Sequence, residues 1–126
     1  MDLKLDDFQL GDAVHRMKEA LLSTPGDTDP QVRREIEARV ARLSGRMDDD
    51  PPAKPSASGS ESLPPAVLSY VEKVAFEAFS ITDQDLESLA KLGYSDDAIF
   101  EITLSAALGA GLGRLDRGLF AVKESE

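Results

Sequence analysis

The last third of the chain limits the possible folds most strongly, because it holds a long helical stretch with almost no charge. Residues 99–115 read IFEITLSAALGAGLGRL, and Glu101 is their only charged residue before Arg114. A helix that is apolar on all sides must be covered on every side, by the rest of a core or by another subunit. We therefore expect this segment to be a central or interface helix.

Two helices are predicted before residue 48. The first has apolar residues at helical spacing from Leu10 to Leu21 and ends before Pro25. The second begins at Asp29 and Pro30, a capping residue followed by proline at the first helical position. Its apolar residues form one stripe, which consists of Val32, Ile36, Val40, Leu43 and Met47.

Three further helices are predicted after residue 62. One begins at Pro64-Pro65 and reaches about Phe79, a short one opens at Thr82, and the long one starts after Ser95. No segment alternates apolar and polar residues around a hairpin turn, and no repeat is visible. We predict an all-α fold, a small bundle of about five helices.

A linker is predicted between these two groups of helices. Residues 48–62 read DDDPPAKPSASGSES, with three prolines, a glycine and four serines but no large apolar residue. Such a segment cannot repay the entropy of ordering. The expected organisation is a two-helix N-terminal arm over residues 1–47, a flexible linker over 48–62 and a helical domain over 63–126. The arm's apolar stripes need a covering surface, which could be each other, the C-terminal helices or another chain.

Composition argues against several classes of function. With 24 acidic and 14 basic residues the net charge is -10, which disfavours nucleic-acid binding because phosphate contacts need clustered Lys and Arg. The chain has no N-terminal apolar run and no long uncharged apolar stretch, so we expect a cytoplasmic protein without a membrane span. It also has no cysteine, which removes disulfides and thiolate zinc sites. We predict no metal site and no cofactor.

The helix boundaries in the C-terminal half carry a family resemblance. A short helix opens at Thr82-Asp83 and stops at Gly93, and a second opens at Ser95-Asp96-Asp97 and continues through Glu101 and a run of small residues to Arg114. Residues 63–120 thereby resemble the C-terminal half of the AhpD-like, carboxymuconolactone decarboxylase-like family.

The family's chemistry is missing from this chain. In that family a Glu is followed about a dozen residues later by Cys-x-x-Cys and then a His, and the thiols exchange disulfides. If Glu101 is aligned with that Glu, the thiol and His positions fall near Gly113, Asp116 and Phe120, which cannot do this work. The single histidine, His15, lies outside the resembling region. The resemblance therefore implies a fold more than an activity.

Glu101 is the one candidate catalytic residue. A carboxylate in an apolar helix must be paired, protonated or at an edge, and Arg114 lies nearly 20 Å further along the same helix, since each residue rises ~1.5 Å. Two roles for Glu101 are open: a catalytic carboxylate, or a structural carboxylate bonded to a neighbouring helix. No second catalytic group in the sequence favours the catalytic role. Five arginines of the second predicted helix, Arg33 among them, are interleaved with glutamates and are expected on a solvated face.

Small residues and one aromatic residue are the candidate interface positions. Ala106, Gly109, Ala110 and Gly113 form a smooth stripe, and glycines inside a helix cost stability that a close contact must offset. Packing within the chain and packing against another subunit are both open. Phe76 shares a face with polar residues, which is typical of a binding surface.

These features predict a non-catalytic AhpD-like subunit or partner protein that acts through helix-helix contacts. Its partner would be a second copy of this chain or a separate AhpD-like chain that carries the Cys-x-x-Cys and His. The alternative is an enzyme of lyase or isomerase type that uses Glu101 in a site shared with a partner chain.

We predict that the purified, metal-free chain has no thiol peroxidase or disulfide reductase activity, because disulfide exchange requires a thiolate and the chain has none. Peroxide consumption with a dithiol donor measures this. Robust turnover would contradict the prediction.

Overall fold

Five α-helices make up the part of the chain that the computed structural model describes, residues 11–45 and 63–124. They are α1 (Gly11–Ser23), α2 (Pro30–Ser44), α3 (Pro65–Phe76), α4 (Asp83–Lys91) and α5 (Asp96–Glu124), with a 3₁₀ turn, η3 (Ala78–Ser80), after α3. These residues contain no strand, so the all-α prediction is confirmed. The predicted linker, residues 48–62, lies outside the described residues.

Local signals set most helix ends where the sequence places them. The Asp29 side chain accepts a hydrogen bond of 2.8 Å from the Gln31 N–H, and Pro30 occupies the first position of α2. Thr82 and Asp85 form a capping box at the start of α4. Gly93 has φ +101°, which suits only glycine well. The prediction for α3 was three residues too long, because the backbone leaves helical geometry at Glu77.

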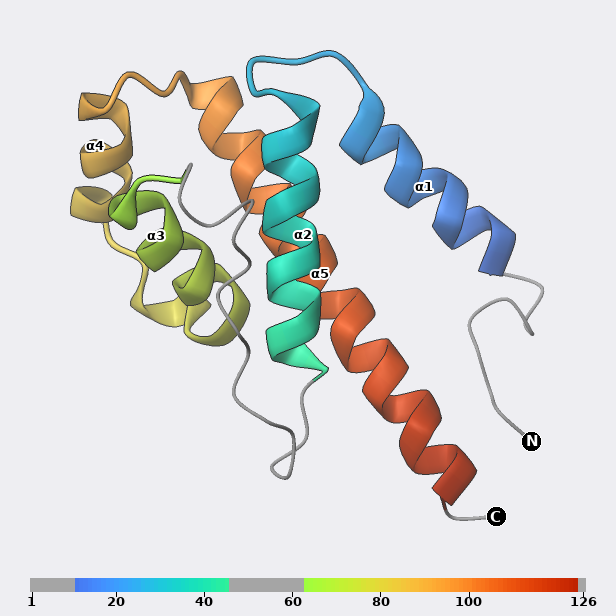
Figure 1. The fold of residues 1–126 in the computed structure, drawn as a ribbon. Helices are drawn as coiled ribbons and strands as arrows, with labels where there is room; N and C mark the ends of the chain where they lie inside the picture. Colours follow the sequence, from blue (N-terminus) through green and yellow to red (C-terminus); the bar gives the residue numbers. More distant parts are fainter. Residues whose placement is uncertain (1–10, 46–62, 125–126) are drawn as a thin grey trace.

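The long helix α5 lies at the centre of the bundle, with α2 running along it and α3 beside both (Figure 1). The helix pair α2 and α5 also supplies much of the core, where Ile36 and Val40 meet Ile102 and Ala106. The second helix of the predicted arm is thus part of the core of its own chain. Val67, Tyr70, Val71 and Ala75 complete the core from α3 and Leu89 from α4.

Two glycines let α2 and α5 approach closely. A Cβ atom at Gly109 would lie 2.5 Å from the Glu37 carbonyl oxygen and 3.0 Å from the Val40 Cβ. One at Gly113 would lie 2.5 Å from the Ala41 carbonyl oxygen. Real Cβ atoms do not approach so near, so only glycine allows this spacing.

The two ends of the bundle are less well covered. Helix α1 contributes one core side chain, Leu22, and is joined to α2 by the ion pairs Lys18–Glu37 at 3.5 Å and Arg34–Glu19 at 2.9 Å. The C-terminal part of α5 continues past the end of α2 (Figure 1). Both features leave apolar side chains exposed.

The two kinds of glycine in α5 give a matched test of the close contact. We expect Gly109→Ala to lower the free energy of unfolding by about 1–3 kcal/mol, because the new methyl group overpacks the α2 backbone. Gly111 has no atom within 4 Å of an added Cβ, so Gly111→Ala should raise the free energy of unfolding by about 0.5–1 kcal/mol through helix propensity. Urea unfolding of dilute protein followed by circular dichroism measures both. Equal effects of the two changes would contradict the close α2–α5 contact.

Candidate functional site

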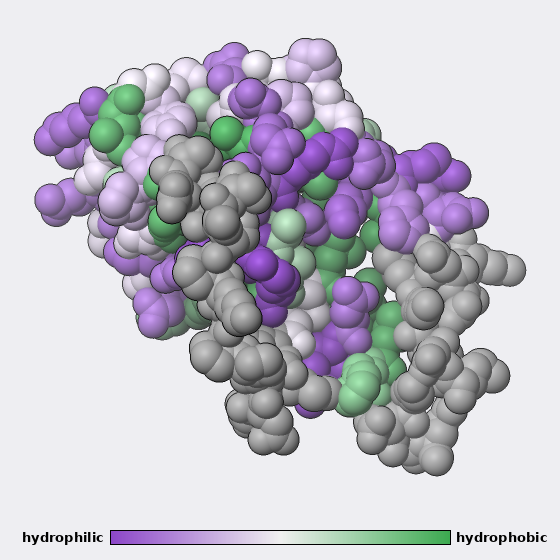
Figure 2. Space-filling model, in the orientation of Figure 1, coloured by the Kyte–Doolittle hydropathy of each residue, from purple (hydrophilic) through white to green (hydrophobic). Residues whose placement is uncertain are grey.

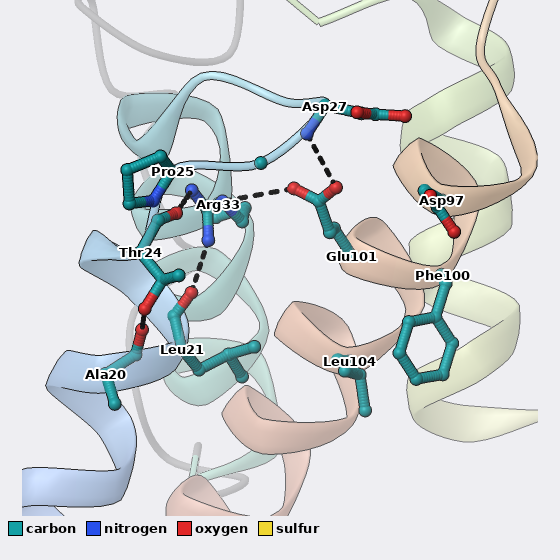
Figure 3. A pocket seen from close by; sticks show the side chains of 11 residues that line it. Ala20, Leu21, Thr24, Pro25, Asp27, Arg33, Asp97, Phe100, Glu101 and Leu104 are labelled. Carbon is teal, nitrogen blue, oxygen red and sulfur yellow. Dashed lines mark hydrogen bonds and ion pairs between the residues drawn. The ribbon is translucent and has the colours of Figure 1, made fainter.

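A cleft of about 390 Å³ opens beside Glu101, between the end of α1, the loop that joins α1 to α2, and the first turns of α5 (Figure 3). Its polar side is formed by Glu101, Arg33 and Asp27. Its apolar wall includes Leu21 and Leu104. The other lining residues are Ala20, Thr24, Pro25, Gly26, Asp97 and Phe100.

The Glu101 carboxylate is held by the loop before α2. It accepts hydrogen bonds from the N–H of Asp27 at 2.9 Å and from the N–H and hydroxyl of Thr28 at 3.2 and 2.8 Å. Gly26 lies so close to this carboxylate that a Cβ there would collide with it. The Asp27 carboxylate in turn accepts a bond of 2.6 Å from the hydroxyl of Ser95, the residue before α5, so the loop is held at Glu101 and at Ser95.

Arg33 is the second charged residue of this network and is only 2% exposed. Its guanidinium donates to the backbone carbonyls of Leu21, at 2.5 Å, and Thr24, at the end of α1. Its Nε lies 3.7 Å from Glu101 Oε1 without a hydrogen bond (Figure 3). The expectation that Arg33 lies on a solvated face was therefore wrong, because the last carbonyls of α1 need a donor and Arg33 is the residue of α2 that reaches them.

This environment keeps Glu101 ionised. Burial raises the pKa of Glu101, but the hydrogen bonds from Thr28 and Asp27, with the charge of Arg33, outweigh burial and lower the pKa below the ordinary value. A general base works best with a pKa near the working pH, and its oxygen must be free to take a proton. Glu101 does not meet the first condition, and three hydrogen bonds already take up most of the about four acceptor positions of its carboxylate. Its geometry is that of a structural clamp joining α1, α2 and α5.

The predicted interface residues fall into two groups. Ala106, Gly109, Ala110 and Gly113 are buried, and α2 of the same chain packs on the stripe at the two glycines. In this structure the stripe therefore packs within its own chain at Gly109 and Gly113. Phe76, at the end of α3, is 47% exposed.

The opposite side of α5 is apolar and mostly exposed, and its residues were not predicted as an interface. Its residues follow the spacing i, i+4, i+7, which places them within about 80° of one another around the helix. Phe100 is 61% exposed, Leu115 38% and Val122 51%. We call this side the outward face of α5; its residues are Phe100, Leu104, Ala107, Gly111, Leu115, Gly118 and Val122.

No charged residue interrupts the outward face. Figure 2 shows the side of the molecule on which α2 lies in front of α5; there, apolar and polar residues are mixed near the part of α5 that α2 does not reach. Two of its members, Gly111 and Gly118, have no atom within 4 Å of an added Cβ. Nothing among the described residues therefore explains the presence of these two glycines inside a helix.

Residues 11–45 and 63–124 contain no cluster of three or more His, Asp or Glu side chains that could hold a metal ion. One of their helices, α5 over residues 96–122, is long and apolar enough to span a membrane, a test that the central helix of a bundle also passes. Comparisons with family models, curated proteins and solved structures give no match, so the AhpD-like resemblance stays a prediction.

The clamp gives a prediction of stability against pH. We expect Glu101→Gln to lower the free energy of unfolding by about 1–3 kcal/mol at neutral pH, because the amide cannot accept from all these donors and leaves Arg33 without its counter-charge. Because the folded pKa of Glu101 is lowered from 4.5, this contribution is present above about pH 4.5 and is lost as the pH falls through the folded pKa. The wild type and variant should therefore converge in acid.

Denaturant unfolding between pH 3 and 7 measures this difference. Glu87→Gln on the exposed side of α4 is the matched control and should change little at any pH. A constant gap between wild type and Glu101→Gln down to pH 3 would show that the charge of Glu101 is not what stabilises the clamp.

Proposed function

We propose that this chain is a non-catalytic helical subunit that acts by binding another polypeptide through the outward face of α5. The partner is a second copy of this chain or, following the resemblance alone, an AhpD-like chain that carries the thiol pair. The observation that carries the proposal is the outward face itself, which has no charged residue from Phe100 to Val122. On it, Phe100 is 61% exposed, Leu115 38% and Val122 51%.

The physical cost of this face supports a contact role. A row of apolar side chains that stays in water forgoes about 25 cal/mol for each Å² that a partner would bury. Contiguous apolar patches of this kind mark interaction sites in proteins, whereas single exposed apolar residues are ordinary. The predicted stripe of small residues does not supply this surface, because α2 covers it.

The alternative, an enzyme of lyase or isomerase type using Glu101, has less support. The carboxylate of Glu101 already accepts hydrogen bonds from Asp27 and Thr28 and is ion-paired with Arg33 at 3.7 Å, and its pKa is lowered. The other carboxylates that line the cleft belong to Asp97 and to Asp27, and the Asp27 carboxylate already accepts a hydrogen bond from the Ser95 hydroxyl.

The proposal is tested by the size of the protein in an extract of the cells from which the sequence comes. We expect the wild type to migrate as an assembly larger than its own 13.6 kDa, and Leu115→Glu to migrate as the free chain, since a buried unpaired carboxylate opposes association. Circular dichroism should show the same helix content for both.

Leu92→Glu is the matched control, because Leu92 is 53% exposed but follows α4 and does not belong to the outward face. It should leave the assembly intact. Migration of the wild type at 13.6 kDa in the extract would overturn the proposed function.

A further inference from the structure

We propose that the outward face of α5 binds the same face of a second copy of this chain, with the two α5 helices antiparallel about a two-fold axis at Gly111. This inference rests on the proposed function and names the partner for the same surface. Three features of the described residues carry it: the order of residue sizes along the face, the overhanging end of α5, and the cleft beside Glu101.

The order of residue sizes makes the face complementary to itself. In an antiparallel pair centred on Gly111, each residue meets the one at equal distance on the other side of Gly111. Leu104 then meets Gly118, and Leu115 meets Ala107. Gly111 meets Gly111 of the other copy, where the two helix backbones come closest, and this explains a glycine that touches nothing in its own chain.

A parallel pair lacks this match. With the helices in the same direction and in register, Leu104 would meet Leu104 and Leu115 would meet Leu115, with unfilled space at the glycines between them. The antiparallel arrangement also sets the two helix dipoles in opposite directions. A two-fold pair uses one patch twice, which is the commonest symmetry of soluble oligomers.

The ends of the face fit the overhang and the cleft. Gly113 is the last glycine of α5 that lies against α2, at Ala41 and Ser44 near the end of that helix, and residues 114–122 follow it. In the antiparallel pair this overhang of one copy lies against Phe100 and Leu104 of the other, and both residues line the cleft. The cleft has a volume of about 390 Å³, far more than the ~30 Å³ of one water molecule, so it has room for side chains of the second copy.

The area required of a dimer shows that α1 must take part. An α5 face about 33 Å long and about 10 Å wide offers on the order of 330 Å², less than half of the ~800 Å² that each partner buries in a standard interface. Ala20 and Leu21 form the facing wall of the cleft on α1, and Met17, one turn earlier on the same side, is 55% exposed. Side chains from the overhang of the second copy enter between these residues and α5, and the overhang itself covers Met17.

Net charge opposes this pairing and gives it a characteristic salt dependence. Each chain carries -10, so two copies repel at long range, while the face between them has no charge to be screened. Dimerisation should therefore strengthen as salt is added from 0.05 to 0.5 M.

The absence of cysteine allows a direct test with single introduced thiols on the purified full chain. We expect Gly111→Cys to form a disulfide-linked dimer under mild oxidation, because the two positions face each other across the axis within the 4.4–6.8 Å that a disulfide spans. Ala107→Cys and Leu115→Cys should each stay unlinked alone and form a mixed dimer when combined. Position 107 faces 115, and it lies roughly 12 Å from the second copy of itself.

Two controls complete the test. Ala90→Cys, exposed on α4, should not link, and Leu104→Glu should weaken dimerisation by roughly tenfold or more in light scattering. The wild type should show twice the mass of one 13.6 kDa chain, with more dimer at higher salt.

Linked dimers of Ala107→Cys alone would show a parallel pair and overturn the antiparallel one. A purified wild type that stays monomeric, yet forms an assembly in the cell extract that Leu115→Glu abolishes, would overturn the second copy as partner and leave the proposed function standing. Monomers in both experiments would overturn both.

Discussion

The close contact between α2 and α5 is the constraint on which the rest of the structure depends. Gly109 and Gly113 bring the backbone of α5 against the carbonyl oxygens of Glu37 and Ala41, with no room for even a methyl group. At that distance Ile36 and Val40 reach Ile102 and Ala106 and exclude water from the centre of the bundle. The cost of two glycines in a helix is repaid by core packing that larger residues would prevent.

The clamp at Glu101 follows from that contact. With α2 laid along α5, the start of α2 comes beside the second turn of α5, and the loop before α2 passes over Glu101. The loop's N–H groups at Asp27 and Thr28 then have a carboxylate to donate to, and Arg33 is buried where it reaches both Glu101 and the last carbonyls of α1. Two side chains thus give hydrogen-bond partners to four backbone groups, the N–H groups of Asp27 and Thr28 and the carbonyls of Leu21 and Thr24.

Local chemistry was predictable from the sequence, whereas the pairing of distant residues was not. Asp29-Pro30, Thr82 and Gly93 act within one turn of the chain, so their helix ends are set by nearby atoms. Arg33 lies in a run of alternating charges that indicates a wet surface, and only its contacts with Leu21, Thr24 and Glu101 decide otherwise. The sequence predicts that the Glu101 carboxylate needs hydrogen-bond or ion-pair partners. Which residues these are depends on how α2 lies on α5.

The exposure of the outward face could not be predicted from the sequence either, because it depends on a difference in length between α2 and α5. The sequence shows that α5 is apolar all round, but it does not show which side a neighbour covers. Helix α2 has 15 residues and α5 has 29, so at ~1.5 Å per residue α2 can follow only about half of α5. Helix α3 lies beside both (Figure 1), and on the side of α5 turned away from α2 the side chains of Phe100, Leu115 and Val122 stay exposed.

The glycines of α5 divide in the same way, and this division connects the fold to the proposed contact. Gly109 and Gly113 point toward α2 and have a neighbour that only glycine admits, while Gly111 and Gly118 point away and have none. Both pairs cost the helix a similar amount of stability, so a contact that explains the first pair leaves the second pair unexplained. A second helix packed along the outward face would give Gly111 a close backbone contact, as α2 does for Gly109. Helix α5 would then be covered on both sides, as its apolar composition requires.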